Sequence, residues 1–125
     1  MILLDASAVL ALARGEPGSE IVVANIETAE ISAVNLSEVI AKLMDWSVPP
    51  DAARLQLDRL NLPTIPFDRE IAVMAGLLRA QTREHGLSFG DRACLATAST
   101  KGHRVLTADR KWTELNLNID IKLIR

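Results

Sequence analysis

Residues 87–96 read LSFGDRACLA, and this stretch marks the beginning of a helix that carries an acid in an unusual place. Ser88 followed three residues later by Asp91 has the form of a capping box, in which the two side chains bind backbone N–H groups of the first turn. Asp91 also shares one helical face with Cys94, Leu95 and Ala98. Such a face is normally buried, and a lone buried charge is costly. Asp91 therefore either caps the helix or shares a cation with other carboxylates, and this stretch alone favours the cap.

The composition is that of an ordinary globular chain. With 125 residues, 49% of them hydrophobic, we expect a single domain spanning residues 1–125. The one cysteine, Cys94, excludes an intrachain disulfide and a cysteine-rich zinc site, and we expect it to be a packed small residue. No apolar run approaches the roughly 20 residues that cross a bilayer, and Met1 leads directly into Ile2 without a basic segment. We therefore expect a cytoplasmic protein with no membrane partner.

The net charge of −2 conceals an uneven distribution. Residues 79–111 carry seven Lys and Arg side chains against three acids, which makes this segment +4 and leaves −6 for the rest. A solvated helix surface explains such a segment, and so does a surface that binds a polyanion. Two of its three acids, Asp91 and Asp109, are themselves candidate metal ligands, and a bound metal would make the region more positive.

Short apolar runs alternate with helical patterns along the whole chain. Five strands are expected, at residues 2–4, 31–34, 64–67, 104–107 and 119–124. The second strand is followed by Asn35 and Glu38, which we interpret as an N-cap and its partner in a helix that ends near Trp46. Ser19 is expected to cap an earlier helix, and Asp68 to cap the longest one. This alternation predicts an α/β fold with a central, mostly parallel five-stranded sheet between helical layers.

Four acids fall near the carboxyl ends of these strands, where parallel sheets bind their ligands. Asp5 follows the first strand, Glu38 lies in the first turns of the next helix, Asp91 opens a later helix, and Asp109 follows the fourth strand. Four converging carboxylates repel one another unless they are protonated or bridged by a metal. Oxygen ligands alone favour Mg²⁺ or Mn²⁺ over zinc. We therefore expect a metal site at this edge of the sheet.

Four segments resemble those of the PIN-domain nucleases, and the match is closest to the toxin ribonucleases of bacterial VapBC toxin–antitoxin pairs. The segments are MILLDASA at residues 1–8, NLSEV at 35–39, LSFGDRACLA at 87–96 and VLTAD at 105–109. Any one of these motifs alone is weak, but four in this order are fairly specific, and the resemblance covers essentially the whole chain. It implies a three-layer α/β/α fold and an acidic pocket that binds one or two Mg²⁺ or Mn²⁺ ions.

The resemblance also assigns roles to residues. Asp5, Glu38, Asp91 and Asp109 match the acidic quartet of the family. Ser7 and Thr107 match its accessory hydroxyl positions, although Ser7 alternatively bonds the backbone at a helix start. The implied activity is metal-dependent hydrolysis of RNA phosphodiester bonds. From the chemistry of that reaction, we expect Asp5 and Asp91 to be the central metal ligands, with Glu38 and Asp109 completing the site directly or through water.

Partners are implied as well. These are a structured RNA such as tRNA or rRNA, a cognate VapB-type antitoxin, and a second copy of the chain in a homodimer. Arg92 and Arg110 lie beside proposed ligands and are candidates for RNA phosphate contacts, while pairing with surface acids explains them equally well.

Two other classes of function remain open from the sequence. The first is a phosphoryl-transfer or receiver-like domain that uses Asp5 with Lys111, although the acid that should neighbour Asp5 is missing. The second is a non-catalytic metal-binding or RNA- or protein-binding module, in which the acids hold a structural cation or only cap helices.

Overall fold

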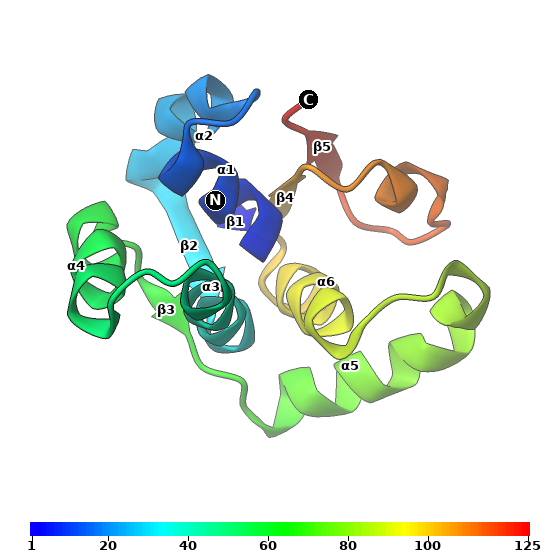
Figure 1. Cartoon of the computed structure of the whole chain (residues 1–125). Helices are drawn as coiled ribbons and strands as arrows, with labels where there is room; N and C mark the ends of the chain where they lie inside the picture. The colour runs from blue at the N-terminus through cyan, green and yellow to red at the C-terminus, as the bar shows by residue number, and fades with distance from the viewer.

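The computed structural model describes all residues from Met1 to Arg125 and is built around one five-stranded sheet (Figure 1). Its strands are β1 (Ile2–Leu4), β2 (Ala29–Ser32), β3 (Thr64–Ile65), β4 (Arg104–Thr107) and β5 (Ile121–Leu123). They lie in the order β3-β2-β1-β4-β5, and every neighbouring pair is parallel. The predicted α/β fold with a five-stranded parallel sheet is confirmed.

Six α-helices connect and cover the strands, together with three short 3-10 helices. The α-helices are α1 (Ala6–Arg14), α2 (Ser19–Asn25), α3 (Ala33–Asp45), α4 (Pro50–Leu60), α5 (Arg69–Thr82) and α6 (Phe89–Lys101). None of them is long and apolar enough to cross a membrane.

The two faces of the sheet have separate hydrophobic cores, because successive side chains of a strand point to opposite faces. Leu3 of β1 packs in one core with the apolar faces of α5 and α6 and with Trp112. Leu4, its neighbour, packs in the other core with residues of α1 to α4. Both leucines are fully buried, which explains why β1 is apolar at every position rather than alternating.

The chain changes direction across the sheet at β1. After β1 it builds β2 and β3 on one side, and it then returns through α5 and α6 to place β4 and β5 on the other side. Adjacent strands on either side of such a reversal leave a crevice at their carboxyl ends. The ends of β1 and β4, followed by Asp5 and by Ala108 and Asp109, lie at this point.

The sequence placed the start of α3 too late. Asn35 is not its N-cap, because the helix begins at Ala33 and the Oγ of Ser32 accepts hydrogen bonds from Val34 N (3.2 Å) and Asn35 N (3.4 Å). Ser32 ends β2 with extended backbone angles, which a capping residue needs, whereas Asn35 already lies in the first helical turn. Strand β2 accordingly ends at Ser32, two residues earlier than predicted.

Other helix ends show one further error and two confirmations. α2 begins at Ser19, but its N-cap is Gly18 and no side chain caps it. Asp68 caps α5 as predicted, since its Oδ1 accepts a hydrogen bond from Ile71 N at 3.0 Å. Ser88 and Asp91 form both bonds of the predicted capping box at the start of α6.

Candidate acidic site

A cavity of about 290 Å³ opens at the carboxyl edge of the sheet, between α1, α3 and α6. All four acids singled out in the sequence line it, which are Asp5, Glu38, Asp91 and Asp109. The five other lining residues are Ala6, Ser7, Leu10, Asn35 and Lys42. The four acids come from four separate parts of the chain. The expected convergence of the four carboxylates is therefore present in the fold.

Asp5 is the most buried of these acids, with 5% of its surface exposed. It is the N-cap of α1, and its Oδ1 accepts hydrogen bonds from the backbone N–H of Ala8 (2.9 Å) and the hydroxyl of Ser7 (2.7 Å). The hydroxyl of Thr107 donates to Oδ2 at 2.6 Å. Three donors thus hold the carboxylate in one orientation.

The two hydroxyls are themselves fixed by the loop after β4. The Oγ of Ser7 accepts a hydrogen bond from Ala108 N at 2.8 Å, and the Oγ1 of Thr107 accepts one from Asp109 N at 3.0 Å. An ionised carboxylate only accepts hydrogen bonds, so both hydroxyls donate their protons to Asp5. Ser7 therefore bridges β1 and the β4 loop instead of bonding the backbone at the start of its own helix.

Burial has a clear effect on Asp5. It raises the pKa of this carboxyl from 3.8 to about 6, because the charged form loses water. The hydrogen bonds from Thr107, Ser7 and Ala8 pull the pKa back, and the charge of Asp91 adds a smaller increase. Near neutral pH, the ionised form of Asp5 therefore lowers the stability of the fold.

Glu38 reaches the cavity from the second turn of α3. Its Oε1 accepts a hydrogen bond from the Nδ2 of Asn35 at 2.5 Å. Partial burial raises the pKa of Glu38, the Asn35 bond lowers it, and the charge of Asp91 raises it further. The carboxylate also packs against Gly90 of α6, where a Cβ atom would overlap it.

Asp91 and Asp109 combine capping with a place in the cavity wall. Asp91 Oδ2 accepts a hydrogen bond from Ser88 N at 3.0 Å, and Asp109 Oδ1 accepts one from Lys111 N at 3.0 Å at the start of a 3-10 helix, Arg110–Glu114. The capping interpretation of Asp91 is therefore correct, but it uses only one oxygen. Asp91, Asp109 and Glu38 each keep one carboxylate oxygen that accepts no hydrogen bond from the protein.

The oxygen donors of this cavity suit a hard divalent cation. No three acidic, histidine or cysteine side chains lie close enough together to enclose a metal ion by themselves. Mg²⁺ characteristically uses one or two carboxylates and keeps several waters, so a more open arrangement of acids still fits it. Asn35 also lines the cavity, and its Oδ1 is buried and accepts no hydrogen bond.

Two polar residues of the cavity wall, Asn35 and Lys42, were not identified from the sequence as site residues. Asn35 was assigned to a helix cap, and Lys42 received no role. Lys42 lies one helical turn after Glu38, and this i, i+4 spacing was the available signal. It forms no ion pair with the acids of the cavity, and its ammonium lies 5.9 Å from the centre of the Trp46 ring.

Arg92 and Arg110 have different surroundings. One terminal nitrogen of the Arg92 guanidinium, Nη1, donates to the carbonyl of Ala75 in α5 at 3.0 Å, and the guanidinium carbon lies 5.9 Å from the Phe89 ring centre. This contact joins α6 to α5 and leaves Arg92 half-buried. Arg110 is exposed and directly follows Asp109. Contact of either residue with RNA stays a prediction, and Arg110 has the freer side chain.

Cys94 and Lys111 carry no visible part of the site. Cys94 is fully buried, and burial together with the charges of Asp5, Asp91 and Glu38 raises the pKa of its thiol well above 9.0. It is a packed residue and a poor nucleophile. Lys111 is exposed and does not line the cavity with Asp5, as a receiver-like mechanism would require.

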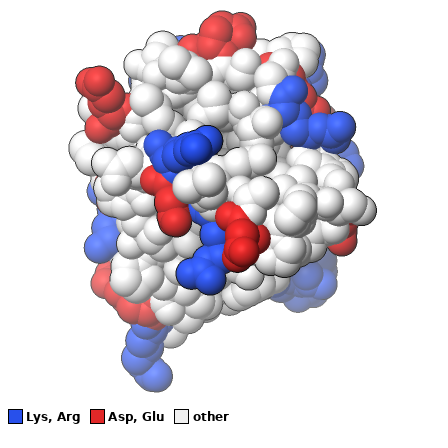
Figure 2. Space-filling model, turned by 60° about the vertical axis from the view of Figure 1, so that its left-hand side comes forward, with Lys and Arg blue, Asp and Glu red and all other residues white.

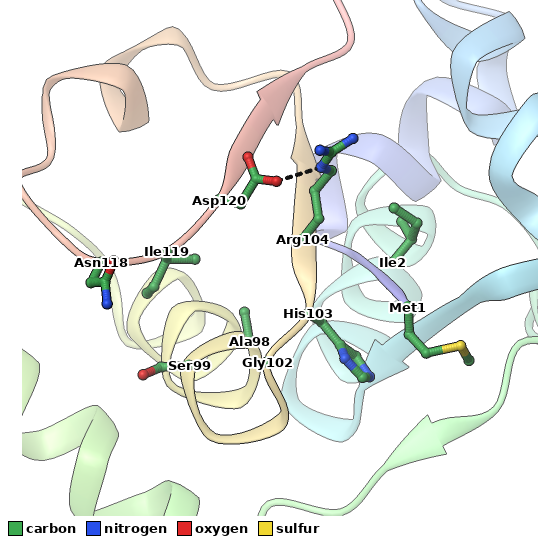
Figure 3. A pocket seen from close by; sticks show the side chains of 10 residues that line it. All are labelled: Met1, Ile2, Ala98, Ser99, Gly102, His103, Arg104, Asn118, Ile119 and Asp120. Carbon is green, nitrogen blue, oxygen red and sulfur yellow. Dashed lines mark hydrogen bonds and ion pairs between the residues drawn. The ribbon is translucent and has the colours of Figure 1, made fainter.

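A roomier cavity of about 520 Å³ lies at the opposite edge of the sheet, near the start of β1 and β4 (Figure 3). Its charged side chains have partners within the protein. Arg104 Nε donates to Asp120 at 2.6 Å, and His103 Nε2 lies 2.8 Å from Glu30 Oε1. The edge that holds four acids is therefore the better candidate for chemistry, despite its smaller volume.

Comparison with known proteins agrees with this fold. The family model of the PIN domain matches residues 2–117, and the chain belongs to this family. No curated protein matches the sequence significantly.

Several solved structures share the fold at low sequence identity. A VapBC2 structure from Rickettsia felis, bound to a DNA fragment from the promoter, has a TM-score of 0.80 at 17% identity, covering 98% of both chains. DNA-bound VapBC from Salmonella typhimurium gives 0.79 at 20% identity, over 99% of this chain and 98% of that one. A toxin–antitoxin complex from Klebsiella pneumoniae has a TM-score of 0.74 at 20% identity, covering 100% of this chain and 98% of that chain.

Proposed function

We propose that this chain is a divalent-metal-dependent endoribonuclease that hydrolyses RNA phosphodiester bonds. The observation that carries the proposal is the cavity in which Asp5, Glu38, Asp91 and Asp109 meet at the carboxyl edge of the sheet. Membership of the PIN domain family supports a nuclease activity. Residues 1–125 would form one catalytic domain.

The four acids would have different roles in binding the metal. Asp5 and Asp91 would be the central ligands, and Glu38 and Asp109 would complete the site directly or through water. A divalent cation there, Mg²⁺ or Mn²⁺, would supply Lewis acidity, lower the pKa of water and offset the charge of the phosphodiester. The open oxygens of Glu38, Asp91 and Asp109 support a part for these three acids in holding a cation. Asp5 would bind through the remaining lone pairs of oxygens that already accept hydrogen bonds from the protein.

Two hydroxyl residues near the cavity would position Asp5 for metal binding. Ser7 and Thr107 hold Asp5 in one orientation through its two oxygens. Ionised Asp5 is costly in this buried place, so a bound cation would favour the charged form.

Cations near the cavity would contact the RNA backbone. Lys42 and Arg110 are both exposed, and Lys42 lines the cavity itself. The face in Figure 2 shows basic and acidic side chains interspersed, with no single basic patch. RNA binding would rest on a few phosphate contacts close to the cavity.

The biological setting we propose is that of a VapC-type toxin in a type II toxin–antitoxin pair. Its fold extends over nearly the full length of chains from VapBC and other toxin–antitoxin complexes. Such a toxin would act in the cytoplasm as a homodimer, would be held by a cognate VapB-type antitoxin, and would cleave a structured RNA such as tRNA or rRNA.

The decisive test is cleavage of total tRNA and rRNA by antitoxin-free protein, with Mg²⁺, with Mn²⁺ and with EDTA. Discrete fragments that require metal and disappear in Asp5→Asn support the proposal. Asp45→Asn is the matched control, since Asp45 is an exposed acid at the end of α3. Equal cleavage by Asp5→Asn would contradict the assignment of the site.

A non-catalytic module remains the second candidate, and one observation favours it. Asp5, Asp91 and Asp109 each cap a helix, so these acids have a structural use without any metal. Stabilisation by Mg²⁺ without cleavage of any RNA would support this candidate.

A further inference from the structure

Asn35 joins the two helices that carry Glu38 and Asp91. Its side chain is buried between α3 and α6, with 2% of the residue exposed. The amide nitrogen donates to Glu38 Oε1 at 2.5 Å and to the carbonyl oxygen of Gly90 at 3.1 Å. Both hydrogens of one nitrogen are thus used to connect a carboxylate on α3 to the residue that precedes Asp91.

Gly90 restrains the same carboxylate from the other side. A Cβ atom at this position would overlap the carboxylate carbon and both oxygens of Glu38. The hydrogen bond from Asn35 and the close backbone of α6 therefore leave Glu38 little freedom. This is more restraint than a tie between two helices needs.

The other end of the Asn35 amide has no partner within the protein. Its Oδ1 is buried and accepts no hydrogen bond, and Asn35 lies in the wall of the acidic cavity. A buried acceptor without a donor is costly, and such groups in native proteins usually serve water or a ligand. The two bonds of the amide nitrogen therefore set the orientation of the Asn35 amide, although its oxygen stays unpaired.

We propose that Asn35 is a positioning residue for cation binding, which fixes the carboxylate of Glu38 relative to Asp91. The inference rests on the proposed metal-dependent function. It assigns Asn35 an effect on the metal that passes through Glu38. If Asn35 only held α3 and α6 together, its replacement would lower the stability of the fold, and its effect on metal affinity would not depend on Glu38.

The test is a double-mutant cycle read as Mn²⁺ affinity, measured from the free Mn²⁺ signal in electron paramagnetic resonance at one fixed pH. The full-length variants are Asn35→Leu, Glu38→Gln and their combination. Asn35→Leu is expected to weaken Mn²⁺ binding by about 10-fold or more, the usual effect of losing a residue that orients a metal ligand. In the Glu38→Gln background the same substitution is expected to have almost no further effect.

Asn25→Leu is the matched control. The amide nitrogen of Asn25 also donates to a backbone carbonyl, that of Ile21 at 2.8 Å, but it does not line the cavity. Its replacement is expected to leave Mn²⁺ affinity unchanged.

A second variant tests the same restraint if Asn35→Leu does not fold. Gly90→Ala places a methyl group against Glu38 and is expected to weaken Mn²⁺ binding, whereas Gly76→Ala, a helical glycine with nothing within 4 Å, is expected to leave it unchanged. Shortening the acid in Gly90→Ala/Glu38→Asp is expected to restore part of the affinity.

The outcomes separate the two proposals. The role of Asn35 alone would be overturned if Glu38→Gln weakens Mn²⁺ binding while Asn35→Leu leaves the affinity unchanged. If Asn35→Leu does not fold, Gly90→Ala takes its place in this comparison. Equal weakening by Asn35→Leu in both backgrounds would do the same. A wild-type protein that binds no Mn²⁺ would overturn this inference together with the proposed metal-dependent function.

Discussion

Thr107 donates a hydrogen bond of 2.6 Å to Asp5, although 102 residues separate them in the sequence. The two residues lie at the carboxyl ends of β4 and β1, which are neighbours in the sheet. Parallel pairing of these strands is therefore what brings the hydroxyl to the acid. The bond ties the orientation of the most buried acid in the site to the central strand pairing of the fold.

Replacing Thr107 by valine should impair the site through Asp5. Valine keeps the shape but removes the proton that the carboxylate accepts, and a hydrogen bond to a charged group contributes about 1.5–3 kcal/mol. We expect RNA cleavage to fall at least about 10-fold, because the charged form of Asp5 is disfavoured. Thr97→Val is the control, since Thr97 is equally buried on α6 and donates only to Ala93. Equal losses in both variants would show a general packing effect.

Metal-free protein should lose stability as the pH rises from about 4 to about 6. Asp5 has a pKa of 3.8 in the reference state and about 6 in the fold, so the folded protein binds the proton more tightly. The stabilisation from protonated Asp5 is therefore complete below the lower pKa and lost above the higher one, by at most roughly 3 kcal/mol. Chemical denaturation across this pH range, in EDTA, measures the change.

Asp5→Asn provides the comparison for this pH effect. The variant cannot ionise at this position, so its stability should decline less than that of the wild type over the same pH range. If the free energy of unfolding changes with pH in the same way for Asp5→Asn and for the wild type, the raised pKa of Asp5 is contradicted.

Addition of Mg²⁺ should stabilise the protein at pH 7.5. A ligand that binds only the folded state at 100 times its dissociation constant contributes about 2.7 kcal/mol. Thermal unfolding with increasing Mg²⁺ should show a rising Tm that EDTA reverses. Asp91→Asn should abolish most of this rise, while Asp68→Asn, which changes an acid that only caps α5, should retain it. A full Mg²⁺ response in Asp91→Asn would argue against Asp91 as a central ligand.

Charge reversal near the cavity should weaken RNA binding and its dependence on salt. Lys42→Glu and Arg110→Glu are best studied in the Asp5→Asn background, which keeps the RNA intact. Each lost phosphate contact should reduce the slope of log affinity against log salt by about 1. Arg54→Glu on α4 is the control, because Arg54 is exposed and does not line the cavity. The same slope in all three variants would remove Lys42 and Arg110 from the RNA interface.

Gly18→Ala should destabilise the fold without a direct effect on the site. Gly18 has φ of +93°, and a Cβ atom there would overlap the backbone carbonyl of Ile124. Strain and overlap together should cost about 2 kcal/mol or more. Gly15→Ala, with φ of +63° but open space around it, should cost about 1–2 kcal/mol. Urea denaturation compares the two, and a smaller loss in Gly18→Ala would contradict the close contact with Ile124.

Much of the local structure was predictable because it depends on neighbours in the sequence. The capping box of Ser88 and Asp91 and the cap at Asp68 follow from residue spacing within one helical turn. The start of α3 was missed because Ser32 and Asn35 are both good capping residues. The choice between them depends on where β2 stops pairing, and β2 pairs with strands distant in the sequence.

Local sequence patterns were sufficient to predict the strand–helix alternation and to locate four acids just after strands or in the following helices. Those features rest on local hydrogen bonding and hydrophobic periodicity, which neighbouring residues specify. The strand order β3-β2-β1-β4-β5 was not predictable from local patterns, and neither were the contacts of Asn35 with Gly90 and of Thr107 with Asp5. These contacts join residues 55 and 102 positions apart, so they depend on how the strands and helices pack around two hydrophobic cores rather than on any local pattern.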